Sequence, residues 1–288
     1  MLNGTLPNRN IGWEKTSEVN VGVDFSFFND RLYGSLDAYY RYTDGALAPS
    51  PHILEPGMAN YWNNIVDMSN RGVEFSIGAD VVRGKAFSWS TMLNLSHNHN
   101  RIESLNDALI STYMQDYFVV GEPMGVTRGY VVDHIIQSRE EIDALNATAQ
   151  QLYGRNYMDN TGVGDYLLKD LDGNGIFDAT YDKTVIANPE PAIFGGWQNT
   201  FSYKNWSLSM LMQFSQGGTA VYNDLLMEVT QPYAGKSVSR ELYGNFWTPA
   251  NTDARYARDG DGIYNYNSTL NDRYVFSTSY LRMKNITL

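Results

Sequence analysis

Apolar and polar residues alternate along six segments of this 288-residue chain. In EVNVGVDFSFF, valine or phenylalanine takes every second position from Val19 to Phe27, and polar residues or glycine lie between them. Strict alternation over eight or more residues indicates a strand with one apolar face. The pattern predicts strands at 18–28, 31–42, 72–82, 87–97, 193–203 and 206–215. A seventh strand is expected near 275–288, where the alternation is weaker.

The connections between these strands are of two kinds. Tight turns are predicted around Asn29-Asp30, Arg83-Lys85 and Lys204-Asn205. Long connections cover roughly residues 43–71, 101–191 and 216–274. Short turns at one edge of a sheet and long loops at the other are typical of outer-membrane β-barrels, whose long loops are extracellular. The first strand is therefore expected to run toward the periplasm, and all the long loops to lie outside the cell.

Some helix is expected within the long loops. In SREEIDALNATAQQLYG, Ser138 is a candidate N-cap and Glu141, three residues later, completes a capping box. A second helix is expected within residues 220–247.

Composition narrows the class of protein. Aromatic residues make up 14% of the chain, with 21 tyrosines, and tyrosine and tryptophan favour membrane boundaries. A mean hydropathy of -0.39 is compatible with a soluble protein. It is also compatible with a membrane barrel, because apolar and polar residues alternate along the strands of a barrel. The net charge of -11 argues against a nucleic-acid partner. The chain has no cysteine, and no run of about 18 apolar residues predicts a membrane helix.

Two other classes of protein compete with the membrane barrel. A soluble β-rich module that binds calcium or carbohydrate would also show alternating apolar and polar residues. The long strands, and loops far longer than the median connection of about 4–6 residues, favour the barrel. A secreted glycan hydrolase needs a pair of carboxylates in a cleft, and no two acidic residues are placed as such a pair. No nucleophile elbow, Walker loop or dinucleotide fingerprint is present. We therefore expect no enzyme activity.

The segment KDLDGNGIFDATYDKT spaces oxygen-bearing side chains as a calcium loop does. The first ligand positions are filled by aspartate and asparagine, and Gly175 stands where such a loop turns sharply. The glutamate expected at the last position is replaced by Tyr181. The alternative is a loop whose Asp and Asn side chains cap their own backbone. We predict a structural calcium site, with no organic cofactor, at Asp170, Asp172, Asn174, Ile176 (through its carbonyl), Asp178 and Asp182.

Aromatic side chains on the long loops are candidates for contact with a substrate or a partner. They are Tyr61, Trp62, Phe246, Trp247, Tyr264 and Tyr266. They could stack on a sugar ring or grip a peptide, although packing between loops or against a partner is the favoured interpretation. Among the histidines, His97 and His99 share a strand face without a third metal ligand, whereas His52 and His134 are isolated in the sequence.

Several blocks of the chain resemble the SusC/RagA family of TonB-dependent outer-membrane transporters. They include NIGWEKTSEVNVGVDFSFFNDRLYGSLDAYYRYTDGAL, NIVDMSNRGVEFSIGADV, VGEPMGVTRGYVVDHIIQSREEIDA, GDYLLKDLDGNGIFDATYDKTVIANPEPAIFGGWQNTFSYKNWSLSMLMQFSQGG and SYLRMKNITL. The blocks follow the family's order and cover nearly the whole chain.

The resemblance implies an all-β fold, an antiparallel transmembrane segment of a barrel of about 22 strands. Residues 1–288 would form part of the barrel domain. Residues 101–191 would form a long extracellular loop region that holds a helix and the calcium-like loop. The family's plug, its TonB-interacting segment and its last strands are expected to lie outside this sequence. We expect no transport by the segment alone, because its open edges would leave backbone groups unpaired in lipid.

The resemblance also implies a function. Such proteins import large nutrients, here glycans or alternatively peptides, across the outer membrane of Gram-negative, Bacteroidetes-type cells. The TonB complex would supply energy through the absent N-terminal parts. A SusD-like surface lipoprotein would act as partner and lid, and outer-membrane lipid would surround the wall.

Overall fold

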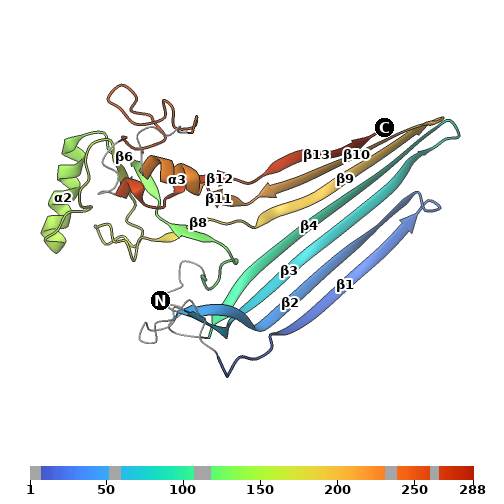
Figure 1. The fold of residues 1–288 in the computed structure, drawn as a ribbon, viewed down its shortest axis with the longest axis horizontal. Helices are drawn as coiled ribbons and strands as arrows, with labels where there is room; N and C mark the ends of the chain where they lie inside the picture. The colour runs from blue at the N-terminus through green and yellow to red at the C-terminus, as the bar shows by residue number, and fades with distance from the viewer. Residues whose placement is uncertain (1–7, 52–59, 107–117, 231–238, 260–265) are drawn as a thin grey trace. The chain divides into compact units, whose positions relative to one another are not determined.

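The computed structural model describes residues 8–51, 60–106, 118–230, 239–259 and 266–288 (Figure 1). The chain divides into two compact units. The first comprises Met1–Val126, Asn188–Thr219 and Ser277–Leu288, and the second comprises Thr127–Ala187 and Ala220–Phe276. Each unit therefore consists of segments that are distant in the sequence.

The first unit is a seven-stranded sheet in the order β1-β2-β3-β4-β9-β10-β13, and every neighbouring pair is antiparallel. The strands are β1 (Lys15–Phe27), β2 (Leu32–Pro51), β3 (Asn60–Arg83), β4 (Phe87–Leu105), β9 (Pro191–Tyr203), β10 (Trp206–Gly217) and β13 (Tyr280–Thr287). All the strands predicted from alternation are present. The strand expected near 275–288 is short, and begins at Tyr280.

Tight turns join the strands at one edge, as predicted. In the β1–β2 turn, Phe28, Asn29 and Asp30 all have positive φ angles between 56° and 59°. Asn and Asp tolerate this left-handed conformation better than most residues. The guanidinium of Arg83 donates to the carbonyls of Asn29 at 3.1 Å and Asp30 at 2.7 Å, which ties the β3 end to this turn.

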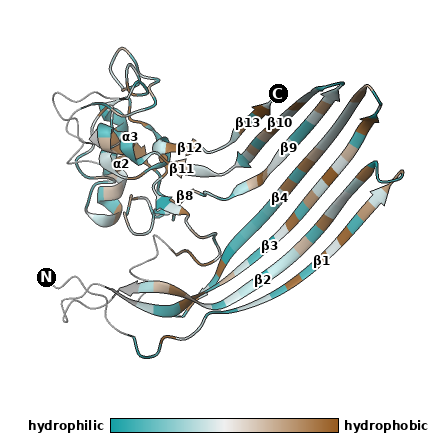
Figure 2. Ribbon diagram, turned by 45° about the vertical axis from the view of Figure 1, so that its right-hand side comes forward, coloured by the Kyte–Doolittle hydropathy of each residue, from teal (hydrophilic) through white to brown (hydrophobic). Residues whose placement is uncertain are grey.

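The strand register places apolar positions beside apolar ones and polar positions beside polar ones, in rows that cross all seven strands. One row of paired positions is almost entirely apolar: Val23, Leu36, Phe75, Leu95, Gly195, Phe214 and Leu281. The adjacent row on the opposite face is polar or glycine: Asp24, Ser35, Ser76, Asn94, Gly196, Gln213 and Arg282. Figure 2 shows the resulting alternation of brown and teal along the strands. The sheet therefore has one apolar and one polar face.

The apolar face of the sheet is not covered by the described protein. Val19 of β1 is 66% exposed and Leu281 of β13 is 74% exposed. A water-soluble protein rarely leaves so large an apolar surface open. In this unit the described residues form one buried cluster, at the extension of β2 and β3: Ala46, Ala48, Ile65, Val66 and Ile102. The apolar face is thus suited to contact lipid.

One prediction about the loops was wrong. Residues 43–71 were expected to form a long connection, but β2 and β3 continue to pair as far as Pro51 and Asn60. The register shifts near Thr43 and Ala46, and both Ala46 and Ile65 are buried. Alternation is lost in this region because bulges interrupt the pattern and apolar side chains on both strands are buried there.

The second unit is a small mixed fold. The predicted helix is present as α2 (Arg139–Tyr153), whose N-cap Ser138 accepts from the Glu141 N–H, and which ends at Gly154. A helix is also present where one was expected within 220–247, as α3 (Asn223–Thr230). The remaining elements are β5 (Thr127–Gly129), β6 (Val132–Ile135), β7 (Tyr166–Leu168), β8 (Thr184–Ala187), β11 (Thr219–Val221), β12 (Val275–Ser277), η1 (Tyr266–Ser268) and η2 (Asp272–Tyr274). In the described ranges, no helix is long and apolar enough to cross a membrane.

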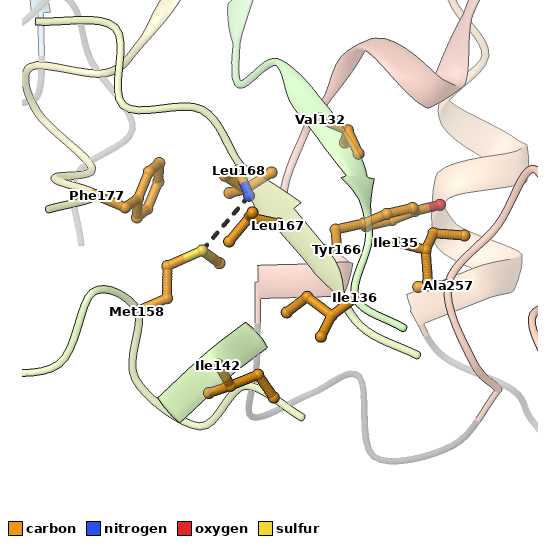
Figure 3. Close-up of a cluster of buried hydrophobic side chains, with 10 residues drawn as sticks. All are labelled: Val132, Ile135, Ile136, Ile142, Met158, Tyr166, Leu167, Leu168, Phe177 and Ala257. Atoms are coloured by element: carbon orange, nitrogen blue, oxygen red, sulfur yellow. Dashed lines mark hydrogen bonds between the residues drawn. The ribbon is translucent and has the colours of Figure 1, made fainter. Parts of the chain in front are cut away.

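The core of the second unit packs α2 against the β6–β7 pair. Figure 3 shows its buried side chains: Val132, Ile135, Ile136, Ile142, Met158, Tyr166, Leu167, Leu168, Phe177 and Ala257. Ala257 belongs to the segment Ala220–Phe276, whereas the others belong to Thr127–Ala187. The two segments of the unit therefore share this cluster.

Candidate functional site

The Asp-rich loop between β7 and β8 gathers three of the predicted calcium ligands. Asp170, Asp172 and Asp182 each place a carboxylate oxygen within 4.8 Å of the other two. Asp182, which stands one position late in the sequence pattern, is fully buried. Carboxylates so close together repel one another unless donors or a cation offset their charge.

Backbone N–H groups supply part of this compensation. The carboxylate of Asp182 accepts from the N–H groups of Leu171 and Asp178, both at 2.6 Å. The carboxylate of Asp170 accepts from Gly175 at 2.6 Å and from Gly173 at 2.7 Å. Burial by itself raises the pKa of Asp170, but these donors outweigh it and the pKa is lowered. Asp170 is therefore ionised at neutral pH.

The other predicted ligands make different contacts. Asn174 Oδ1 accepts from the Ile176 N–H at 3.0 Å, and the Ile176 side chain is buried. The carboxylate of Asp178 accepts from the Thr180 N–H at 2.8 Å and lies 3.6 Å from an Arg155 nitrogen. Asp178 thus lies outside the group of three carboxylates.

A second group of charged side chains surrounds His134, which looks isolated in the sequence. Its Nδ1 lies 2.8 Å from Asp133 Oδ2, and its Nε2 contacts Glu141 Oε1. The Lys169 ammonium lies 3.6 Å from the other Asp133 oxygen. Burial lowers the pKa of His134, but the hydrogen bonds to both carboxylates outweigh it and the pKa is raised. The sequence signal for this group was the capping-box glutamate, Glu141, which helix formation places beside β6.

A buried ion pair links the two segments of the second unit. Asp165 is 1% exposed, and its carboxylate accepts from Arg258 Nε at 2.7 Å and from Asn267 Nδ2 at 2.7 Å. It also accepts from the Gly162 N–H at 2.7 Å. This group has a structural role, since it fastens residues more than ninety positions apart.

Most of the candidate loop aromatics that the structure describes pack within the second unit. Trp247 donates from Nε1 to Gln137 Oε1 at 3.1 Å, Tyr266 stands edge-on to Phe177 at 4.9 Å, and Phe246 lies beside Tyr256. Trp62 of β3 differs, with 48% of its surface exposed. Tyr264 and the side chain of Tyr61 lie outside the described residues. Contact of this set with a substrate or partner stays a prediction.

The polar face of the sheet carries a chain of hydrogen bonds that includes Tyr39 of β2 and Asn98 of β4. The Tyr39 hydroxyl donates to Asn98 Oδ1 at 2.8 Å, and Asn98 Nδ2 donates to Glu190 Oε1 at 3.1 Å. The Tyr39 ring covers Gly72, where an added Cβ would lie 2.5 Å from the ring. This face therefore offers hydroxyl, amide and carboxylate groups to a hydrated molecule.

Comparison with known proteins adds to this geometry. The model of the TonB dependent receptor-like β-barrel family matches residues 2–125. The chain is 30% identical to TonB-dependent receptor P3 of Formosa agariphila, over 97% of the chain and 27% of that protein. It is also 30% identical to TonB-dependent receptor SusC of Bacteroides thetaiotaomicron, over 98% of the chain and 26% of that protein. The chain thus spans about a quarter of the length of these relatives.

Solved structures agree with this fold. The RagAB peptide transporter matches 98% of this chain and 29% of its own chain, with a TM-score of 0.71 and 21% identity. The predicted antiparallel sheet of an outer-membrane barrel is confirmed by the strand order, the two-faced register and these similarities. Residues 2–125 thus match a TonB-dependent receptor-like β-barrel, and the chain as a whole is similar to TonB-dependent receptors such as SusC, which are β-barrel proteins of the outer membrane.

Proposed function

We propose that the protein imports large nutrients across the outer membrane with energy supplied through TonB, and that this chain forms part of the barrel wall and its extracellular loops. The two-faced sheet carries the proposal, since one face suits lipid and the other suits a hydrated passage. The similarity to SusC, named a TonB-dependent receptor, and to RagAB, named a peptide transporter, supports the same function.

The cargo that we propose is an oligosaccharide, with a peptide as the alternative. The polar row that includes Ser35, Ser76 and Asn94 offers neutral hydroxyl and amide groups, which can exchange hydrogen bonds with sugar hydroxyls. A SusD-like surface lipoprotein is the proposed partner, with the TonB complex acting through parts outside this chain. Trp62, being exposed, is the best placed of the described candidate aromatics for contact with cargo or partner.

Uptake by cells tests this function. A Bacteroidetes strain that lacks the gene should lose growth on the cognate oligosaccharide but keep growth on its monosaccharide, and the gene should restore uptake. A proton uncoupler should abolish uptake of the labelled oligosaccharide, because TonB depends on the proton gradient. Loss of uptake of peptides alone would reassign the cargo. Unchanged uptake of every oligosaccharide and peptide supplied would contradict the transport function.

We also propose that the loop holding Asp170, Asp172, Asn174, Ile176, Asp178 and Asp182 binds calcium and stiffens the second unit. The close approach of three carboxylates supports this proposal, because hard dications prefer oxygen ligands. On the extracellular side, where the loop is proposed to lie, calcium would act as a structural staple.

Calcium should therefore raise the stability of the second unit. At a hundredfold excess over Kd, a ligand bound only by the folded state adds about 2.7 kcal/mol. Asp172→Asn should weaken calcium affinity and change the metal-free protein little, since its amide oxygen can still accept from the Asn174 N–H and only the exposed hydrogen bond from Asn174 Nδ2 is lost. Titration calorimetry and thermal unfolding in chelator and in calcium would measure both effects. Equal calcium affinity in Asp172→Asn and in the wild type would count against the site.

A further inference from the structure

A cavity of about 780 Å³, widely open to solvent, lies between α2 and the β7 end of the second unit. Its walls are largely apolar and include Ala144 and Leu145 of α2 and Leu167 of β7. Asp133, His134 and Glu141 form part of its lining. A cavity of this size, mainly apolar with a few convergent polar groups, is the usual form of a site for a small molecule or a side chain.

The contacts of His134 need a proton on each ring nitrogen. An imidazole that lies between two carboxylates can donate to both Asp133 and Glu141 only as the imidazolium. A neutral ring donates to one carboxylate and turns a lone pair toward the other. Loss of one proton therefore leaves one carboxylate of the cavity without its donor.

We propose that this cavity binds the arginine side chain of a peptide, whose guanidinium replaces the His134 proton as the donor to the carboxylates. The site is built by residues 133–175 of the second unit, so it does not depend on the transport function. The aliphatic part of arginine would lie along Ala144, Leu145 and Leu167, as long cationic side chains commonly lie on apolar surface. The guanidinium is a planar cation whose donors match a carboxylate in pairs.

The charges around the cavity select a cation. His134 contacts Asp133 of its own strand and Glu141 of α2, and Lys169, Asp170 and the Tyr157 phenol also line the cavity. Burial raises the pKa of Tyr157 to about 12, so the phenol is neutral. Even with Asp170 left to its own loop, Asp133 and Glu141 against Lys169 leave one excess negative charge when His134 is neutral. This excess charge would repel an anionic ligand. The Asp170 carboxylate already accepts hydrogen bonds from the Gly173 and Gly175 N–H groups of its own loop.

Binding of the cation and protonation of His134 should therefore compete. The pKa of His134 is raised above the usual value of about 6.5, so the imidazolium predominates in mildly acidic solution. The affinity for arginine should increase with pH by up to about tenfold per unit below the pKa of His134 and level off above it. A ligand that binds beside the cavity without displacing the proton would not show this dependence.

The test is calorimetric titration of the whole chain in detergent with N-acetyl-leucyl-arginine amide. The matched probe is the citrulline amide, which has nearly the same shape and no charge. Titrations between about pH 6 and about pH 8 bracket the usual histidine pKa. We expect saturable binding of the arginine peptide that strengthens with pH, and at least about tenfold weaker binding of the citrulline peptide, because charge-assisted hydrogen bonds are the strong ones.

Three variants separate this site from general folding effects. Glu141→Gln should weaken arginine binding about tenfold or more, while its amide still caps α2 through the Gln137 N–H. His134→Gln should keep binding but lose its pH dependence. Asp143→Asn, on the exposed side of α2 and paired with Arg139, should behave as the wild type. Equal binding of the two peptides, no saturable binding, or wild-type affinity in Glu141→Gln would overturn the proposal.

Discussion

Replacing Asp165 with alanine should lower the free energy of unfolding of the second unit by about 3 kcal/mol. The carboxylate is 1% exposed and accepts from Arg258, Asn267 and the Gly162 N–H. Removing one partner of a buried ion pair leaves the other charge and its donors poorly compensated. We take the lower end of the usual range, because the Arg258 side chain is 38% exposed and keeps some solvation.

Hydrogen exchange would measure this effect in the chain itself. The amides of β6 and β7 should lose protection in Asp165→Ala, since these strands pair beside Asp165. Asp143→Ala provides the control, because its partner Arg139 is exposed and such a pair contributes at most about 0.5 kcal/mol. Similar exchange in both variants would show that the Asp165 contacts do not join the two segments.

A charge placed on the apolar face of the sheet should prevent normal assembly in the membrane. Leu93 of β4 pairs with Ile77 and Trp197 on that face. Arginine at the lipid-facing midplane of a barrel costs about 2–4 kcal/mol, so Leu93→Arg should sharply reduce the folded form. Asn94→Arg, one position along the same strand, places the same charge on the polar face and should be tolerated.

The heat-modifiable band in outer-membrane fractions would report the folded amount of each variant. Leu93→Arg should lose most of this band, and Asn94→Arg should retain it. If both variants assembled equally well, the apolar face would not be in contact with lipid.

The strands of the first unit could be predicted from the sequence because their chemistry repeats every two residues. From Val19 to Phe27, the polarity of each side chain indicates which face of the sheet it occupies. The turn at Asn29-Asp30 fixes the pairing with β2. The helix α2 could be predicted for a similar reason, since Ser138 and Glu141 define its first turn locally. Local patterns of this kind need no knowledge of distant contacts.

The contacts of the second unit could not be predicted in this way. Asp165 and Arg258 are 93 positions apart, and nothing near either residue indicates the other. His134 meets Glu141 only because α2 folds back beside β6. Asp182 joins Asp170 and Asp172 although it misses the expected spacing, because the loop closes on itself through backbone donors. Contacts between irregular segments that are distant in the sequence depend on how the chain packs. A local pattern of residue types does not contain that information.

We expect one face of the sheet to contact lipid and the other to contact water. The chain has no cysteine, so single cysteines can be introduced and spin-labelled along β4 without background. In membranes, labels at Trp89, Thr91, Leu93 and Leu95 should be relaxed by lipid-soluble oxygen, and labels at Ser88, Ser90, Asn94 and Ser96 by a water-soluble nickel chelate. Such an alternation with period two would support one lipid-facing and one water-facing side of the sheet. Equal access of the nickel chelate to both sets would contradict it.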